Sequence, residues 1–257
     1  IHWHPYSSAA TGRNAKLGVF LDVYGVELSD SKIVFPDDQG GAVYAGDGPT
    51  LIDGGNFVEN TSGTSGGAIG SNGPVTLAGV TFLRNHATGY GGAVWADDSG
   101  PVSGSLVSTG GIYEENRSEN EGGALASDRP IIVDGGIFTR NSAFSDGGAI
   151  CSPNGSVTVT TASTDGTFTE NTADTGTGGA IATDGRVELD GADFIRNHAD
   201  DWGGAVVSWS GNNAHCPIVI VYSGAYRRCR WNDRIRCVSG TGVSKRLVVG
   251  GRKCSSS

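Results

Sequence analysis

Methionine is absent from the 257 residues, position 1 included, so the sequence predicts a processed chain or an excised fragment. No apolar run approaches the roughly 18 residues that a transmembrane helix needs, and the chain is therefore expected not to span a membrane. Apolar residues at helical spacing are also missing, and glycine, at 43 residues, is too frequent for helices. These absences favour a chain of short strands and turns.

Basic residues are scarce in the first 210 positions, which carry 9 Lys and Arg against 26 Asp and Glu, a net charge of −17. Such a body would repel nucleic acid. Residues 211–257 reverse the balance, with 9 basic residues against 1 acidic residue. The same segment holds four of the five cysteines, at spacings that do not match a zinc site. They favour two disulfides in a secreted end-cap, with the pairing left open.

Two motifs recur through most of the chain and define a repeat of about 25 to 31 residues. The first is Gly-Gly-Ala followed by an aliphatic residue, and its copies begin at Gly40, Gly66, Gly91, Gly122, Gly147, Gly178 and Gly203. The second is an aromatic residue, two variable residues and an asparagine, with the asparagines at Asn60, Asn85, Asn116, Asn141, Asn171 and Asn197. A third short β-type run lies between the two motifs, as in Val75–Leu77.

Three short runs at a fixed register predict an all-β solenoid, a parallel β-helix of about seven to nine coils with three short strands per coil. Like residues then stack on like at the strand spacing of about 4.8 Å. The six asparagines are expected to form a buried ladder at a turn, in which each amide bonds the next one along the axis. The paired glycines are expected at tight corners that no side chain would fit.

Coil lengths alternate, because successive Gly-Gly-Ala copies are 26, 25, 31, 25, 31 and 25 residues apart. The extra residues, 96–106 and 152–164, predict a protruding loop on the same side of every second coil. The chain is divided into an N-terminal cap with a degenerate first coil (1–39), regular repeats (40–210), and a C-terminal segment (211–257). That last segment is either a basic, cysteine-containing cap or a non-native tail.

The combined motif, as in Phe82-Leu-Arg-Asn followed by Gly91-Gly-Ala-Val, resembles the polymorphic outer membrane protein repeat. That repeat occurs in bacterial autotransporter adhesins and in large secreted β-helix proteins. The resemblance covers about residues 40–206. It implies a right-handed parallel β-helix, an extracellular or cell-surface location, and a role in adhesion, without fixing a ligand.

Aromatic residues beside Gly-Gly-Ala are the first candidate ligand-binding set. Tyr90 and Trp202 immediately precede it, and Trp95 follows it at a position that strand alternation turns outward. Asp97 and Asp98 on the first long loop complete the set, and Ca²⁺ held by this pair and backbone carbonyls is the one cofactor considered. The alternative for the acidic pair is a solvated turn.

Catalytic residues are not assigned, because the two acidic pairs, Asp97–Asp98 and Asp200–Asp201, are expected about 20 Å apart, too far for one two-carboxylate glycosidase centre. The sequence therefore favours a non-catalytic, adhesin-like scaffold that displays loops for a polysaccharide or a cell-surface protein. Two alternatives stay open: a polysaccharide lyase or hydrolase of the β-helix type, and a structural filament subunit, with the chain then part of a longer assembly.

Overall fold

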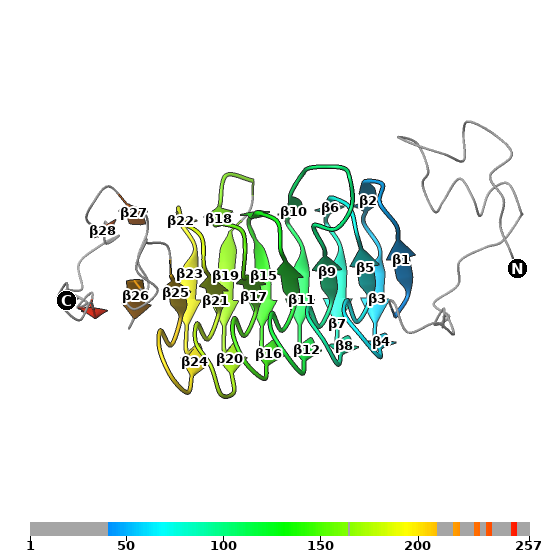
Figure 1. The fold of residues 1–257 in the computed structure, drawn as a ribbon. Coiled ribbons are helices and arrows are strands. Elements are labelled where there is room, and N and C mark those ends of the chain that lie inside the picture. The colour runs from blue at the N-terminus through cyan, green and yellow to red at the C-terminus, as the bar shows by residue number, and fades with distance from the viewer. Residues whose placement is uncertain are drawn as a thin grey trace, which may run out of the picture.

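The computed structural model describes residues 41–163 and 165–209, and four strands beyond them: β26 (Ile218–Val221), β27 (Cys229–Trp231), β28 (Ile235–Cys237) and β29 (Val248–Gly250). Figure 1 shows residues 41–209 as a row of stacked coils, each strand beside its equivalent in the next coil. The predicted cap over 1–39 lies outside the described residues, as does most of 211–257. None of the residues described forms a helix that could cross a membrane.

Sheet A follows the Gly-Gly-Ala motif and sheet B the third β-type run, and both pair parallel from coil to coil. The parallel strands of sheet A are β1 (Val43–Ala45), β5 (Ile69–Ser71), β9 (Val94–Ala96), β13 (Leu125–Ser127), β17 (Ile150–Ser152), β21 (Ile181–Thr183) and β25 (Val206–Ser208). Those of sheet B are β2 (Thr50–Asp53), β6 (Val75–Ala78), β10 (Leu106–Thr109), β14 (Ile131–Asp134), β18 (Val157–Thr160) and β22 (Val187–Leu189). Strands β26 and β29 extend sheet A, and β27 and β28 extend sheet B, all by antiparallel pairing.

Sheet C carries the aromatic residues, and sheet D follows each asparagine. Sheet C contains β3 (Asn56–Val58), β7 (Thr81–Leu83), β11 (Ile112–Glu114), β15 (Gly136–Thr139), β19 (Gly166–Thr169) and β23 (Asp193–Ile195). Sheet D contains β4 (Thr61–Ser62), β8 (His86–Ala87), β12 (Arg117–Ser118), β16 (Ser142–Ala143), β20 (Thr172–Ala173) and β24 (His198–Ala199). The predicted parallel β-solenoid is confirmed.

Two details of the prediction need correction. Within residues 41–209 the structure has six complete coils and the first strand of a seventh, slightly fewer than the seven to nine expected. Each complete coil has four strands rather than three, because two residues after every asparagine also pair from coil to coil. These two-residue strands are too short and too polar to stand out from turns in the sequence.

The core consists of stacks of identical or similar side chains that run along the solenoid axis, as predicted, with one residue of each stack from each coil. The aromatic rings of sheet C stack along the axis, with centroid distances between 4.4 and 5.2 Å and interplanar angles between 5 and 14°. Aliphatic residues of sheets A and B fill the rest. The tyrosine in the ring file, Tyr113, places its hydroxyl 2.7 Å from the hydroxyl of Ser108, so its polar atom is satisfied and burial raises its pKa.

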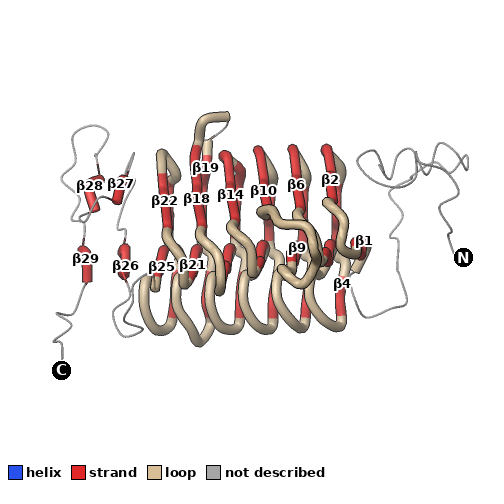
Figure 2. Tube along the Cα trace, turned by 45° about the horizontal axis from the view of Figure 1, so that its top comes forward, coloured by secondary structure: helices blue, strands red, loops and turns tan. Residues whose placement is uncertain are grey.

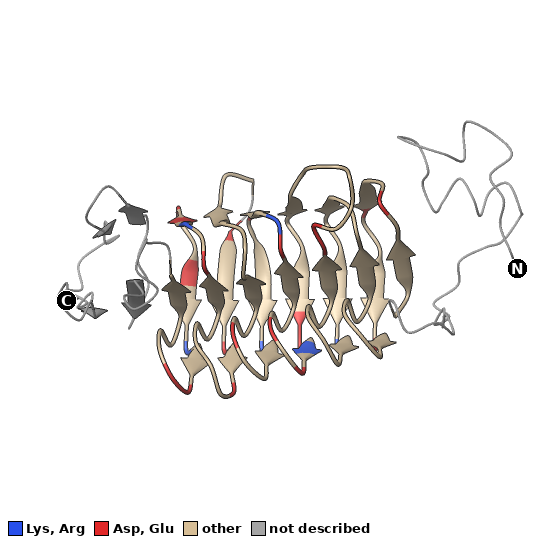
Figure 3. Cartoon of the chain, in the orientation of Figure 1, with Lys and Arg blue, Asp and Glu red and all other residues tan. Residues whose placement is uncertain are grey.

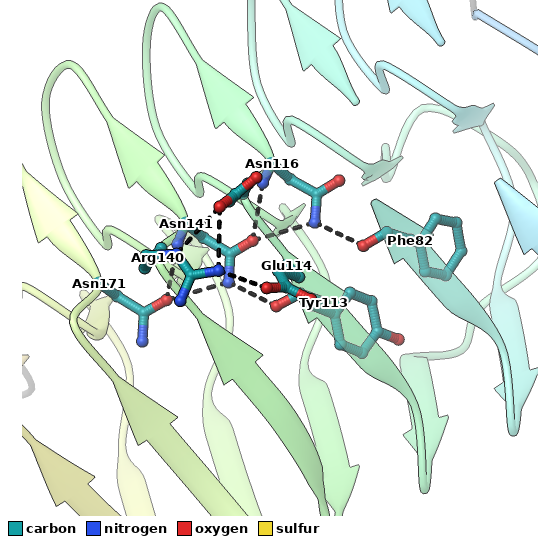
Figure 4. Close-up of polar contacts among 8 residues, drawn as sticks. Phe82, Tyr113, Glu114, Asn116, Arg140, Asn141 and Asn171 are labelled. Atoms are coloured by element: carbon teal, nitrogen blue, oxygen red, sulfur yellow. Dashed lines mark hydrogen bonds and ion pairs between the residues drawn. The ribbon is translucent and has the colours of Figure 1, made fainter. Parts of the chain in front are cut away.

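The asparagine ladder is confirmed and continuous over all six coils, and Figure 4 shows its middle part, from Asn116 to Asn171. In each step the side-chain amide of one asparagine donates to the side-chain oxygen of the next, at 2.8 to 3.0 Å. The backbone N–H of the same asparagine donates to that oxygen as well, as Asn116 does to Asn141. The second amide hydrogen reaches back to the carbonyl of an aromatic residue in the preceding coil, as Asn141 does to Tyr113.

The charges beside this ladder repeat with a period of two coils. The residue before each asparagine has a positive φ, between 50 and 57°, and these residues alternate in charge: Glu59, Arg84, Glu115, Arg140, Glu170 and Arg196. Each arginine pairs with the glutamate of the coil before it, as Arg84 does with Glu59 at 2.9 Å. The two-coil period seen in the coil lengths therefore also appears in these ion pairs.

The long loops do not lie on one side of the solenoid, contrary to the expectation from coil length. The first, residues 97–105, joins β9 of sheet A to β10 of sheet B. Two coils later the main extension falls instead between β18 of sheet B and β19 of sheet C. The two loops leave opposite ends of the strands of sheet B, as Figure 2 shows, because the two insertions fall in different turns of their coils.

Candidate functional site

Four of the aromatic residues that lie outside the core form two stacked pairs along the outer face of sheet A. In each of the parallel strands of this sheet the first residue points into the core, and the middle residue points away from it. Trp95 is the middle residue of β9 and is half-buried, between the fully buried Val94 and Ala96. Its indole stacks on the ring of Tyr90, from the turn before the same strand, with centroids 4.8 Å apart. The structure thus brings two of the predicted residues together.

A second aromatic pair lies at the other end of the same face. Trp202 is 39% exposed and stacks on Trp209, with centroids 5.5 Å apart. Trp202 occupies the turn position of Tyr90, directly before the Gly-Gly-Ala motif, and Trp209 directly follows β25. Sequence reasoning missed Trp209, although aligning the coils would have placed it on the same edge of sheet A as Asp97.

Asp97 and Asp98 hold the long loop in place. Asp97 accepts hydrogen bonds from the backbone N–H and the hydroxyl of Ser99, at 3.2 and 2.9 Å. Asp98 pairs at 3.1 Å with Arg129, whose side chain is fully buried. The guanidinium also donates to the carbonyls of Asp97 and Asn72, so it ties together three successive coils.

Metal ligands are not clustered in this part of the chain. Among residues 41–163 and 165–209, no group of three or more histidine, cysteine, aspartate or glutamate side chains is placed to hold a metal ion. The acidic pairs at Asp97–Asp98 and Asp200–Asp201 lie beside strands β9 and β25, which are four register steps apart. That spacing agrees with the separation of about 20 Å expected from the strand spacing.

An acidic pocket of about 100 Å³ opens on the face between the two aromatic pairs. Its lining includes Glu121, Asp146, Asp184 and Trp209, with Cys151 at its floor. Sequence reasoning did not identify this pocket. Its carboxylates come from turns before and after sheet A, where the residue type varies from coil to coil, so no repeated motif marks them.

The electrostatics of the pocket follow from burial and from like charges. Burial raises the pKa of the Glu121 carboxyl most, and the nearby carboxylates of Asp146, Asp184 and Asp128 raise it further. Burial and Asp146 likewise raise the pKa of Asp184. The Cys151 thiol donates to Glu121 at 3.3 Å, and burial raises its pKa well above the ordinary value. It therefore stays a neutral thiol and is a poor nucleophile.

A stack of short parallel strands with an open face of aromatic and acidic residues defines a repeat protein of the parallel β-solenoid class. The family model of the Chlamydia polymorphic membrane protein repeat matches residues 79–97, 135–153 and 165–184, which confirms the predicted repeat. Each matched segment runs from the aromatic motif through Gly-Gly-Ala to the end of the following strand of sheet A. The comparisons with curated proteins and with solved structures gave no match.

Proposed function

We propose that this chain is a non-catalytic, adhesin-like scaffold of the cell surface, and that it binds a carbohydrate or a protein on the outer face of sheet A. The observation that carries the proposal is the pair of aromatic stacks, Tyr90–Trp95 and Trp202–Trp209, on one open face. Aromatic side chains left at the surface of a protein with a filled core are typical of binding sites. The match to a repeat of surface proteins supports the location.

A carbohydrate-active enzyme is the second candidate, and the acidic pocket favours it. Raised carboxyl pKa values in a pocket beside a tryptophan are typical of acid–base catalysis on sugars. The two candidates differ in whether a bound polymer is cut. Cys151 is a neutral, buried thiol, and Asp97 and Asp98 already bond Ser99 and Arg129, so none of these three residues favours the enzyme.

Replacing Trp95 or Trp202 by alanine is expected to weaken ligand binding about tenfold, because aromatic anchors carry much of the free energy at binding surfaces. The measurement is an array of glycans, polysaccharides and cell-surface proteins, run with and without Ca²⁺. Each array is read for binding and for release of new sugar ends.

Ile137→Ala is the matched control, because Ile137 is a large apolar residue, 44% exposed, on sheet C and away from this face. Equal binding by the two tryptophan variants and the original chain would refute the proposed face. New reducing or unsaturated sugar ends would show that the polymer is cut, and would favour the enzyme over the non-catalytic scaffold. Binding that requires Ca²⁺ would favour a cation site at Asp97 and Asp98.

A further inference from the structure

The floor of sheet A is recessed between the two aromatic pairs. Ala126, Cys151 and Ala182 are the middle residues of β13, β17 and β21, and their register puts them in one file. They point away from the core, yet each is at most 3% exposed. Something other than the core must cover them, and the turns that flank the sheet do so. The first glycine of each Gly-Gly-Ala motif lies directly against this file, as Gly122 does against Ala126.

The walls of the recess carry negative charge that no cation in its lining balances. Glu121 and Asp146 stand on the turns that precede the strands, and Asp184 stands on the corner that follows β21. Neither lysine nor arginine is among the residues that line the pocket. Arg140 pairs with Glu115 beside the asparagine ladder, and Figure 3 shows where the basic and acidic residues lie along the coils. A ligand that enters the recess therefore meets uncompensated carboxylates.

One aromatic pair lies on each side of the acidic pocket along sheet A, and Trp209 of the second pair also lines the pocket. Trp95 on β9 and Trp209 after β25 are separated by four register steps along sheet A, or about 19 Å at the strand spacing. Indole faces attract cations through the ring quadrupole, most strongly when the site excludes water. The small floor, the acidic walls and the indole ends thus favour the same kind of ligand, one that is long, narrow and positively charged.

We propose that the outer face of sheet A, from Trp95 across the acidic pocket to Trp209, binds an extended polypeptide segment that carries lysine or arginine side chains. The segment lies along the solenoid axis, with cationic groups against Glu121 and Asp184 and over the indoles. At about 3.3 Å per residue, six residues span the distance between the two pairs. The inference rests on the proposed function and names the partner class for the same face.

Other occupants fit this recess less well. A neutral glycan would stack on the indoles but leave the carboxylates without counter-charges, and an acidic polysaccharide would be repelled. A single metal ion would lack ligands, because the described residues hold no cluster of three metal-binding side chains. A peptide, in contrast, offers cationic side chains together with backbone N–H donors for the carboxylates.

Fluorescence anisotropy with labelled octapeptides of alternating lysine and serine tests the inference, with an aspartate–serine peptide as the negative probe. The lysine peptide is expected to bind and to weaken as salt rises, because exposed charges are screened. The double variant Glu121→Gln with Asp184→Asn is expected to lose at least about tenfold in affinity, since charged interface groups are often worth that much or more. The side-chain oxygen of glutamine at position 121 can still accept the hydrogen bond from the Cys151 thiol.

The matched control is Glu59→Gln with Glu170→Gln, which changes the net charge equally at carboxylates that pair with Arg84 and Arg196 beside the asparagine ladder. Loss in the pocket variant with retained binding in the control supports the inference, given equal thermal stability of the variants. Equal losses in both would overturn it, as would no binding of the lysine peptide. If a neutral glycan binds and depends on Trp95 and Trp202 while the peptide does not, this inference fails and the proposed function stands.

Discussion

Replacing Gly123 by alanine destabilises the solenoid by about 3 kcal/mol or more, a large effect for a single methyl group. A Cβ at this position would lie 2.1 Å from the carbonyl oxygen of Gly148 in the next coil and 2.6 Å from that of Ser142. Both neighbours are backbone atoms, held by hydrogen bonds between coils, so they cannot move aside without breaking the stack. Denaturant unfolding followed by circular dichroism measures the loss.

Gly48→Ala is the control for this variant. A Cβ at Gly48 meets no atom within 4 Å, and its φ lies outside the left-handed region. We expect its midpoint of unfolding to stay within the small range typical of surface substitutions, about 0.5 kcal/mol. Similar midpoints of unfolding for the two variants would contradict the inference that the Gly-Gly-Ala motif allows neighbouring coils to approach closely.

Replacing Asn141 by alanine is the second large perturbation, with an expected loss of about 3 kcal/mol. The side-chain oxygen of Asn141 accepts the backbone N–H and the amide of Asn116, and its own amide donates to Asn171 and to the carbonyl of Tyr113. Alanine removes all four bonds and leaves donors of Asn116 buried without an acceptor. Each unsatisfied buried group costs about 1–3 kcal/mol.

Asn154→Ala provides the comparison, because Asn154 is exposed and its amide makes a single bond, to Asp128 at 2.7 Å. Its removal is expected to cost little, since water replaces the lost partner. Thermal and urea unfolding of both variants, under one set of conditions, give the difference. A ladder variant as stable as the Asn154 variant would show that the stacked amides do not hold the coils together.

The stacking of the coils could be predicted from the sequence because residues that contact each other in successive coils must be of the same type and at the same position in the repeat. Asn116 and Asn141 bond each other only if they occupy the same place in successive coils, and the same register stacks Tyr113 on Phe138. The fixed spacing of these residues therefore encodes the coil. The strands of sheet D escaped prediction since two residues such as Arg117–Ser118 show no alternation of their own.

The candidate site could be predicted only in part, because its residues do not repeat. Trp95 and Trp202 were identified from their position beside a repeated motif, and the structure places each in a stacked pair. Glu121 and Asp184 are ordinary turn residues in the sequence, and only the stacked coils bring their charges together. Arg129 was missed for a related reason: the partners of this buried arginine come from two other coils.

The location of the binding face is the central claim, and backbone hydrogen exchange with and without a bound ligand tests it most directly. The ligand is the lysine–serine peptide or the strongest binder from the array. Our account predicts slower exchange in the turns beside sheet A, residues 119–122, 144–147 and 184–185, with no change on the outer faces of sheets B and C. Slower exchange confined to sheets B and C would contradict it and move the binding face to another side of the solenoid.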